Sequence, residues 1–224
     1  MRRGLGIVAV LLIVAAGLDF GVRLVFERVA EGAIEAKRGI NGPVDVAFHG
    51  WPFLTKLASR EFPRVTIVAE DVRGGALGSS SLARGDEAPV ELVHLDALGV
   101  TLGDDGGRRI VRVRSGTGDA TITGSALARM LPRDYAVEIE VLDGEIRVTG
   151  ESPAGAQQVL VPEEGVRIEA DDLAGRLRID APAPVGPLLI ALPALVDGSV
   201  FRSVEVLDGS VRFTFTVRDV ELPL

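Results

Sequence analysis

The stretch from His49 to Val65, HGWPFLTKLASREFPRV, contains the residue types of this chain best suited to binding chemistry. It holds the only tryptophan and two of the eight phenylalanines, although aromatic residues make up only 4% of the sequence. Lys56, Arg60 and Arg64 follow one another at intervals of four residues, which places them on one stripe of a helix if the helix extends that far. Cations bind phosphate and a Trp ring suits an apolar–polar boundary, so the stretch suits a phosphate-bearing headgroup.

The local sequence predicts the element that positions these side chains. Trp51 to Leu54 cannot form a central strand, because Pro52 lacks a backbone donor. Apolar residues then recur at helical spacing, and Pro63 ends the pattern; they are Leu54, Leu57, Ala58 and Phe62. We therefore expect a short amphipathic helix that begins after an aromatic turn and carries a basic edge. The alternative is a purely structural helix that plugs one end of a sheet, with its cations solvated.

The composition limits the kinds of fold and function that the chain can have. The 224 residues fit one domain plus a targeting segment, and 47% of them are hydrophobic, enough for a sizeable core. The net charge of −8 argues against nucleic acid as a partner, so any attraction to anionic lipid must be local. The chain has no cysteine, which excludes disulfides and thiolate metal sites.

The amino terminus has the pattern of an export signal. Arg2 and Arg3 precede an uncharged apolar run from Gly4 to Leu18. Fifteen helical residues span roughly 22 Å, short of the ~30 Å hydrocarbon core, so a cleaved signal peptide and a longer uncleaved anchor both remain open. We expect residues 1–19 to be this segment and residues 20–224 to form one domain outside the cytoplasmic membrane. The alternative is a buried amino-terminal helix of a cytosolic protein.

A helix is predicted from Phe20 to Arg38. Its apolar positions recur at helical spacing and are expected to face the core, while charged residues cover the other face. The less favoured alternative is a helix that lies on a membrane surface. The apolar set is Leu24, Val25, Val29, Ala33 and Ile34, and the charged set is Glu27, Arg28, Glu31, Glu35 and Lys37.

After this helix the hydrophobic period changes to two, which predicts strands. We expect them at residues 44–48, 64–72, 90–102, 108–123, 137–142, 145–149, 157–162, 166–170 and 173–181. Residues 59–63 and 74–81 are turn-rich, and Gly116 and Gly118 predict a bulge or bend. The fold class is therefore α+β, with long antiparallel strands and few, mostly short helices.

Two segments repeat. The sequences Glu140–Thr149 and Glu205–Thr214 share seven of ten residues, and each follows a predicted short helix, at residues 125–131 and 188–196. An Asp-Gly pair between alternating runs is a strong hairpin signal. We expect the two hairpins to occupy pseudo-symmetric places in one antiparallel sheet, with positive φ in the tight turns at Gly144 and Gly209.

The motifs of common enzymes are missing from the sequence. His49 and His94 are the only histidines, and neither has a metal-ligand spacing. There is no nucleophile elbow and no phosphate-binding loop. Paired acids such as Asp104-Asp105 and Glu163-Glu164 lie in polar connections and are expected to be solvated. We predict no catalytic residues, no cofactor and no metal.

The order of features resembles the LmeA family of actinobacterial cell-envelope phospholipid-binding proteins. The resemblance depends on Gly50-Trp51-Pro52-Phe53-Leu54-Thr55-Lys56-Leu57 and Phe62-Pro63-Arg64-Val65, after an apolar segment, a helix and a short strand. It implies a fold similar to the tubular (BPI-like) lipid-binding proteins, in which a long curved antiparallel sheet wraps around the amino-terminal helix and encloses an apolar groove.

The expected function is that of an exported, membrane-associated protein that holds phospholipid, preferably anionic, in an apolar groove and serves cell-envelope lipid or lipoglycan metabolism. The expected lipid-binding residues are Trp51, Phe53, Leu54 and Leu57 on the apolar side and Lys56, Arg60 and Arg64 at the headgroup. Two rivals remain: an enzyme that processes lipid in the same groove, and a non-catalytic accessory that binds a protein partner.

Overall fold

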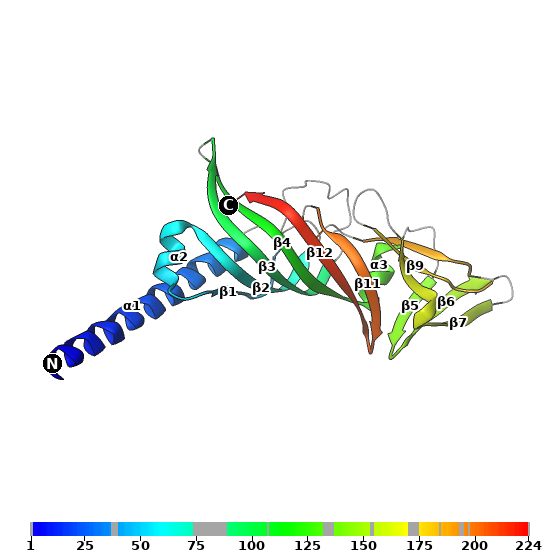
Figure 1. The fold of residues 1–224 in the computed structure, drawn as a ribbon. Helices are drawn as coiled ribbons and strands as arrows, with labels where there is room; N and C mark the ends of the chain where they lie inside the picture. Colours follow the sequence, from blue (N-terminus) through cyan, green and yellow to red (C-terminus); the bar gives the residue numbers. More distant parts are fainter. Residues whose placement is uncertain are drawn as a thin grey trace.

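The computed structural model of the chain describes residues 2–36, 40–73, 89–106, 108–131, 137–152, 155–169, 175–183, 185–192, 195–196 and 198–223, with the backbone alone for residues 2–13, 105, 108, 109, 151, 152, 155 and 223. The molecule is elongated: a long helix projects at one end, the largest sheet lies in the middle, and smaller sheets lie at the other end (Figure 1). The predicted α+β class is confirmed.

Three antiparallel sheets contain the strands. The six-stranded sheet has the order β1-β2-β3-β4-β12-β11 and consists of β1 (Val44–His49), β2 (Glu61–Arg73), β3 (Pro89–Asp105), β4 (Arg108–Thr123), β12 (Ser210–Pro223) and β11 (Val200–Leu207). The two three-stranded sheets are β5 (Val137–Leu142), β6 (Glu145–Ser152) and β7 (Gly155–Pro162), and β10 (Leu188–Ala191), β9 (Arg176–Ile179) and β8 (Val166–Glu169). The helices are α1 (Arg2–Glu35), α2 (Phe53–Ser59), α3 (Gly124–Met130) and the 3-10 turn η1 (Glu163–Gly165).

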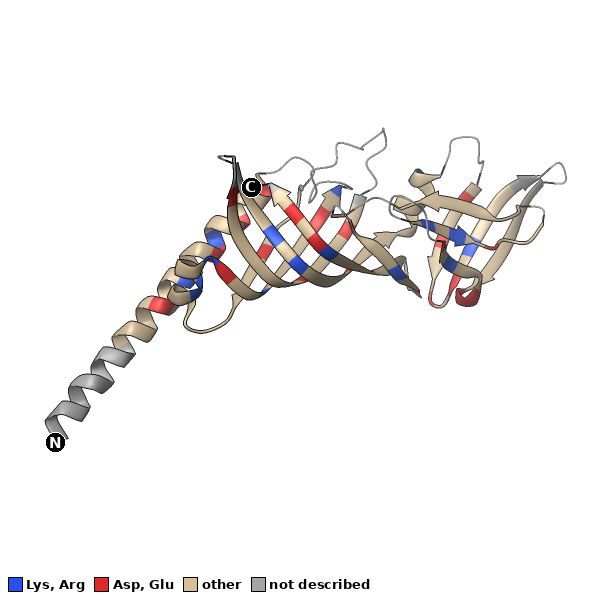
Figure 2. Cartoon of the chain, turned by 45° about the horizontal axis from the view of Figure 1, so that its top comes forward, with Lys and Arg blue, Asp and Glu red and all other residues tan. Residues whose placement is uncertain are grey.

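Alternation of side chains gives the six-stranded sheet one apolar face. In β1, for example, Val44, Val46 and Phe48 are buried and Asp45 is exposed. Buried residues from all six strands belong to one hydrophobic core cluster, which continues into the smaller sheets. Acidic and basic residues recur along the long strands (Figure 2), and those on β4 and β12, such as Arg114 and Arg218, are exposed.

Helix α1 packs on this core with a different face from the predicted one. Phe26, Ala30 and Ile34 are partly buried against the core, whereas Val25 and Val29 are more than 60% exposed. Of the five residues expected to face inward, only Ile34 contacts the core cluster among the described contacts. Helical periodicity finds an apolar stripe but cannot show whether protein or another medium covers it.

The glutamates predicted to be solvated on α1 instead cover the edge of the sheet. Carboxylate oxygens of Glu27, Glu31 and Glu35 accept hydrogen bonds from the backbone N–H groups of Phe48, Val46 and Val44, at 2.9, 3.4 and 3.2 Å. These are alternate amides of β1, an edge strand that has β2 on its other side. We call these three contacts the carboxylate rungs; they satisfy donors that an edge strand would otherwise leave open.

The two repeated hairpins are pseudo-symmetric but lie in different sheets. β5–β6 belongs to a three-stranded sheet and β11–β12 to the six-stranded one, so the prediction of a single sheet is wrong. The turns nevertheless bind each other reciprocally: Gly209 N–H donates to the Val141 carbonyl at 3.1 Å, and Gly144 N–H donates to the Val206 carbonyl at 3.3 Å. Both glycines have the predicted positive φ, 72° and 74°.

Three other local predictions are wrong. The predicted helix at residues 188–196 does not begin there, because Leu188–Ala191 is strand β10 paired with β9; residues 193 and 194 lie outside the described residues. Residues 59–63 are not a loop, because β2 begins at Glu61. Of the bulge or bend predicted at Gly116 and Gly118, the bulge is absent, since both residues stay in register with β3 and β12. A Cβ at Gly118 would lie 2.3 Å from the His94 carbonyl oxygen and 2.6 Å from the Phe215 ring, so glycine is required for close packing.

Candidate functional site

The aromatic and basic stretch is divided among three elements. Gly50 to Pro52 connect β1 to α2, α2 covers seven residues, and Arg60 ends the helix in the left-handed conformation, with φ 57°. The backbone N–H of Arg60 donates to the Leu57 carbonyl. The predicted short helix after an aromatic turn is therefore confirmed, but it ends before Phe62 and Arg64, which lie in β2.

Two of the aromatic residues of this stretch are structural. Phe53 and Phe62 are each 1% exposed, and they pack with Phe26 of α1 and Phe48 of β1. All six pairs among these four rings have centroids 4.8–6.2 Å apart, the range in which aromatic pairs attract. Half of the eight phenylalanines thus join α1, α2, β1 and β2 in one cluster, as the structural interpretation of the stretch expects.

The other apolar residues of the stretch lie at the surface. The Trp51 side chain is 76% exposed and Leu54 is 41% exposed, whereas Leu57 is partly buried against the core. Of the four residues expected on the apolar side of a lipid site, Trp51 and Leu54 are therefore the two whose surface is open to a ligand.

The three cations do not share one helical stripe. Lys56 is half-buried on α2 and Arg60 is exposed at its end. Neither has an ion-pair partner among the residues that the structure describes. Arg64 is different, because its guanidinium donates to both carboxylate oxygens of Asp96, at 3.1 and 2.6 Å. The expected headgroup role of Arg64 is therefore weakened.

Asp96 is the centre of a polar network on the outer face of the sheet. It also accepts a hydrogen bond from the Thr66 hydroxyl at 2.7 Å, and Thr66 in turn lies 2.9 Å from His49 Nε2. The hydrogen bonds from Arg64 and then from Thr66 hold the pKa of Asp96 below its ordinary value.

Asp19 is the residue of this region that sequence reasoning missed. It is 7% exposed, and its two carboxylate oxygens accept hydrogen bonds from the backbone N–H groups of Phe53 and Leu54, at 2.8 and 2.7 Å. Pro52 supplies no side-chain cap for α2, so a residue of α1 caps α2 in its place. A sign was present in the sequence: Asp19, Arg23 and the three rung glutamates recur every four residues, on one stripe of α1.

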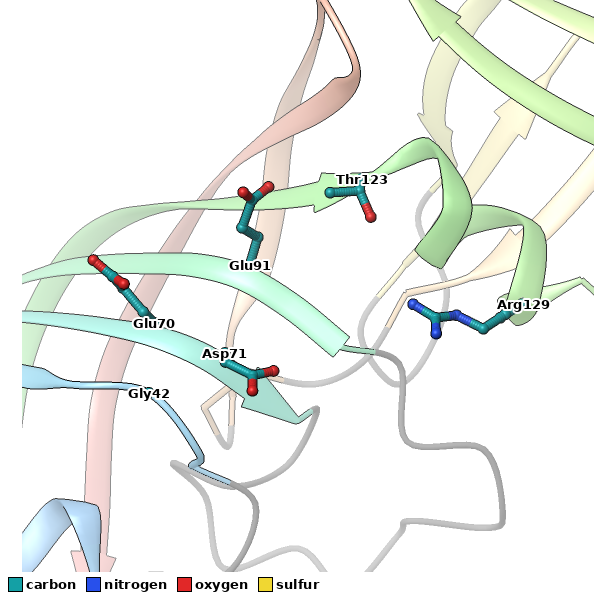
Figure 3. A pocket seen from close by; sticks show the side chains of 6 residues that line it. All are labelled: Gly42, Glu70, Asp71, Glu91, Thr123 and Arg129. Atoms are coloured by element: carbon teal, nitrogen blue, oxygen red, sulfur yellow. The ribbon is translucent and has the colours of Figure 1, made fainter.

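Two surface pockets formed by described residues lie away from α2. The first has a volume of about 290 Å³, and Figure 3 shows carboxylates of Glu70, Asp71 and Glu91 around it, with one guanidinium from Arg129. This excess of negative charge disfavours a phosphate. The second, of about 300 Å³, contains Arg112, Arg114, Asp219 and Glu221. Neither is the predicted apolar groove.

The second histidine and the acids form no metal site in the described chain. His94 Nδ1 lies 3.3 Å from Asp119 Oδ1. No group of three His, Asp or Glu side chains in the part of the chain that the structure describes could hold a metal ion. Among described residues, no helix combines the length and mean hydropathy of a membrane span.

A model of the LmeA-like phospholipid-binding family matches residues 17–220. The chain belongs to this family. The match runs from α1 to β12 and thus includes the whole Trp51 region, which confirms the resemblance first seen in Gly50–Leu57 and Phe62–Val65. No curated protein and no solved structure matches the chain. Membership in the LmeA-like family indicates phospholipid binding, and the family description names binding rather than catalysis.

Proposed function

We propose that this LmeA-like protein is an exported, membrane-associated protein that holds a phospholipid with its headgroup at α2 and acts, without catalysis, in cell-envelope lipid or lipoglycan metabolism. The observation that carries the proposal is the combination, on one seven-residue helix and its flanks, of exposed apolar side chains with cations that no described acid neutralises. The family match supports the ligand class.

Lys56 and Arg60 form the part of the proposed site that binds the lipid headgroup. From Gly50 to Arg60 these are the only charged residues, so this segment of the sequence is positive although the whole chain carries −8. Phosphate oxygens accept charge-assisted hydrogen bonds from both side-chain types. Because the rest of the protein repels anions only over a Debye length of about 8–10 Å, a local pair of cations is sufficient to favour an anionic lipid.

The acyl chains need an apolar surface, and we place it between α1 and the six-stranded sheet. The inner face of this sheet is filled by its own side chains, such as the fully buried Phe213 and Phe215. Helix α1 adds only three partly buried residues, Phe26, Ala30 and Ile34. The acyl chains would therefore lie where α1 meets the sheet, beside these three residues, as in the curved sheet that wraps a helix in tubular lipid-binding folds.

The compartment is part of the same proposal. Arg2 and Arg3 before the apolar run from Gly4 to Leu18 support residues 1–19 as a retained anchor, with residues 20–224 as one domain on the extracytoplasmic side. Retention also keeps the Asp19 cap of α2, which removal of residues 1–19 would delete. A carboxyl-terminal reporter that is active only in the cytosol should be silent, and a strong signal from it would contradict this topology.

The first experiment tests ligand and chemistry together. Full-length protein is purified, its lipids are extracted, and they are identified by mass spectrometry. A phospholipid in near-stoichiometric amount is expected. Incubation with added phospholipid should leave it chemically unchanged, whereas a product that accumulates with time would favour the lipid-processing enzyme. Absence of any bound lipid would favour the accessory protein.

The second experiment tests the headgroup. A Lys56→Gln/Arg60→Gln variant should bind an anionic phospholipid with a fluorescent acyl chain roughly 10- to 30-fold more weakly at low salt, since each cation near a lipid phosphate contributes about 1 kcal/mol. Binding of a zwitterionic lipid should change less. The matched control is Arg114→Gln/Arg218→Gln, which removes the same charge from exposed positions on β4 and β12. If both double variants lost affinity for the anionic lipid equally, Lys56 and Arg60 would have no specific role at the headgroup.

A further inference from the structure

The exposed apolar residues of this protein are concentrated at one end. Of 13 large hydrophobic side chains that are exposed in the described chain, nine lie on α1 or beside α2, and only Leu98, Leu160, Leu189 and Val200 lie elsewhere. Single exposed apolar residues are normal, but a contiguous group marks a surface that something covers. We define the apolar collar as six of the nine: Leu18, Phe20, Val22, Val25, Trp51 and Leu54.

We propose that the apolar collar is a bilayer-contact surface, in which these side chains enter the acyl-chain boundary of an anionic membrane and Trp51 lies at the level of the headgroups. The inference rests on the proposed membrane location but concerns a contact separate from the binding of a single lipid. It commits to the membrane as the occupant, on four observations that follow.

The first observation is that α1 is apolar on every exposed side at this level. Between Val14 and Val25 the charged residues are Asp19 and Arg23. Asp19 is buried against α2, and Arg23 pairs with Glu27 at 2.8 Å. A partner helix would cover a single stripe of α1. A helix that is apolar around its whole exposed surface fits surroundings that contact it from all sides, as lipid does.

The second observation is that the two parts of the collar are held together. The hydrogen bonds from Phe53 and Leu54 N–H to Asp19 fix the start of α2 beside the turn of α1 that carries Leu18 and Phe20. Trp51 and Leu54 therefore stand at the same level along α1 as these two residues. A fixed, preformed apolar edge inserts without an ordering cost.

The third observation is the sign of the adjacent charge. Lys56 of α2 and Arg60, which ends α2, follow the exposed Leu54, and the first acid after Leu54 in the sequence is Glu61. Basic segments of α2 lie beside α1 at the base of the projecting helix (Figure 2). Apolar side chains with neighbouring cations and a Trp at the boundary are the composition of a membrane-interface contact.

The fourth observation is continuity. The backbone of α1 is helical from Arg2, and the uncharged run that begins at Gly4 reaches the collar at Leu18 on the same helix. The helix projects away from the sheets at this end (Figure 1). The collar therefore stands where the apolar helix meets the body of the protein, which is the level at which a membrane-bound domain contacts the bilayer.

Trp51 provides the test, because it is the only tryptophan and belongs to the collar. Full-length protein is mixed with vesicles of mixed anionic and zwitterionic phospholipid, whose acyl chains carry bromine at different depths. The expected result is a blue shift of the Trp51 emission, with quenching strongest for bromines near the headgroup. A Leu18→Gln/Leu54→Gln variant, which keeps Trp51, should lose at least half of this quenching. The control Leu98→Gln, which changes an exposed leucine on β3, should keep it.

The outcomes separate this inference from the proposed function. Vesicle-bound protein whose Trp51 is neither shifted nor quenched overturns the collar contact, even when phospholipid co-purifies with the chain. Quenched Trp51 in a protein that carries no lipid supports the collar contact while the proposed lipid binding fails. Concentration-dependent self-association that protects Trp51 from added vesicles would assign the collar to a second copy and would also overturn the inference.

Discussion

Asp19 shows how a carboxylate can occur next to an uncharged apolar run. Its charge is bound by the first two N–H groups of α2, at 2.7 and 2.8 Å, so the residue is buried with its hydrogen-bonding capacity used. An anion at a helix N-terminus is also favoured by the helix dipole. One side chain thus caps α2 and joins it to α1.

Replacing Asp19 should therefore destabilise the protein. Asp19→Ala leaves two N–H groups without their acceptor, and we expect the free energy of unfolding to fall by about 1–3 kcal/mol. Asp19→Asn keeps one acceptor oxygen and should cost less. Urea denaturation measures both, and the control Asp45→Ala, at an exposed position of β1, should change stability by less than about 0.5 kcal/mol. A loss from Asp19→Ala no larger than that of the control would show that the cap is unimportant.

The Arg64–Asp96 pair predicts a dependence of stability on pH. The pKa of Asp96 is lower in the folded protein than in the unfolded chain, chiefly because Arg64 donates to its carboxylate. The pair therefore stabilises the fold fully above the ordinary Asp pKa of about 3.9 and loses this effect as the pH falls through the folded pKa.

The stability difference between Asp96→Asn and the parent should thus be largest near pH 7 and should shrink below about pH 4. Urea denaturation at steps from pH 7 to pH 2 measures it. In an Arg64→Gln background the Asp96→Asn difference should be smaller at neutral pH, because the principal donor is gone. A pH-independent difference would mean that the carboxylate charge is irrelevant.

At the scale of elements, the carboxylate rungs explain why β1 can be an edge strand. Its outward N–H groups at Val44, Val46 and Phe48 have acceptors on α1, so a foreign strand finds no open donors there. The amides of Asp45 and Ala47 alternate with these and point toward β2. The same strand is thus held by a sheet on one side and by helix side chains on the other.

Amide hydrogen exchange tests the rungs one at a time. Glu31→Ala should speed the exchange of the Val46 N–H about fivefold or more, because a hydrogen bond to a charged group contributes at least about 1 kcal/mol. Glu31→Gln retains an acceptor and should have a smaller effect. The Ala47 N–H is the internal control and should be unchanged. Equal acceleration at Val46 and Ala47 would indicate general fraying of β1 instead of a lost rung.

The elements differ in how well the sequence predicts them. The boundaries of β4 and β5 are correct because alternation is regular and a polar or Asp-Gly turn separates neighbouring strands. Leu188–Ala191 was predicted as helix because a short apolar run carries no usable period. The prediction of which face of α1 points inward was wrong, because the apolar stripe that periodicity detects is largely exposed.

The candidate site was predictable to a similar degree. The family motif located the exposed Trp51 and Leu54, but Phe53 in the same motif is core. The spacing of Lys56, Arg60 and Arg64 assumed one continuous helix, and the left-handed conformation of Arg60 ends that helix. The Asp19 contact joins residues 34 and 35 positions apart in the sequence, so the spacing along α1 singles out Asp19 but cannot identify its partners on α2.

At the scale of the whole molecule, the reciprocal hairpin turns join the six-stranded sheet to the sheet of β5–β7. Each turn glycine donates to the carbonyl of the equivalent valine in the other hairpin. The repeated hairpins also carry equivalent ion pairs, Arg147 with Glu140 and Arg212 with Glu205. The sequence repeat therefore corresponds to a local two-fold relation at the junction of two sheets.

This relation predicts matched effects of substitution. Gly144→Ala and Gly209→Ala should each lower the free energy of unfolding by about 1–2 kcal/mol, because both force a residue with a side chain into the left-handed region. A Cβ at either position meets no atom within 4 Å, so steric contact adds nothing to this loss. Thermal or urea denaturation measures the two losses. Gly32→Ala is the control: it also meets no atom within 4 Å but is helical, and it should stabilise by about 0.4–1 kcal/mol. Clearly unequal losses would contradict the two-fold equivalence.

The carboxylate rungs also match two different spacings, that of every fourth residue of α1 and that of every second residue of β1. Four residues of helix advance about 6.0 Å and two residues of strand about 6.6–6.8 Å, so each further rung adds a mismatch of roughly 0.6–0.8 Å. Over the three rungs the donor–acceptor distances stay between 2.9 and 3.4 Å, so side-chain torsions absorb the mismatch. At the fourth position the chain has Arg23, which pairs with Glu27, and opposite it stands Gly50, where φ is 119° and the strand has ended. The series of glutamates on α1 thus ends at the same level as the edge strand that it covers.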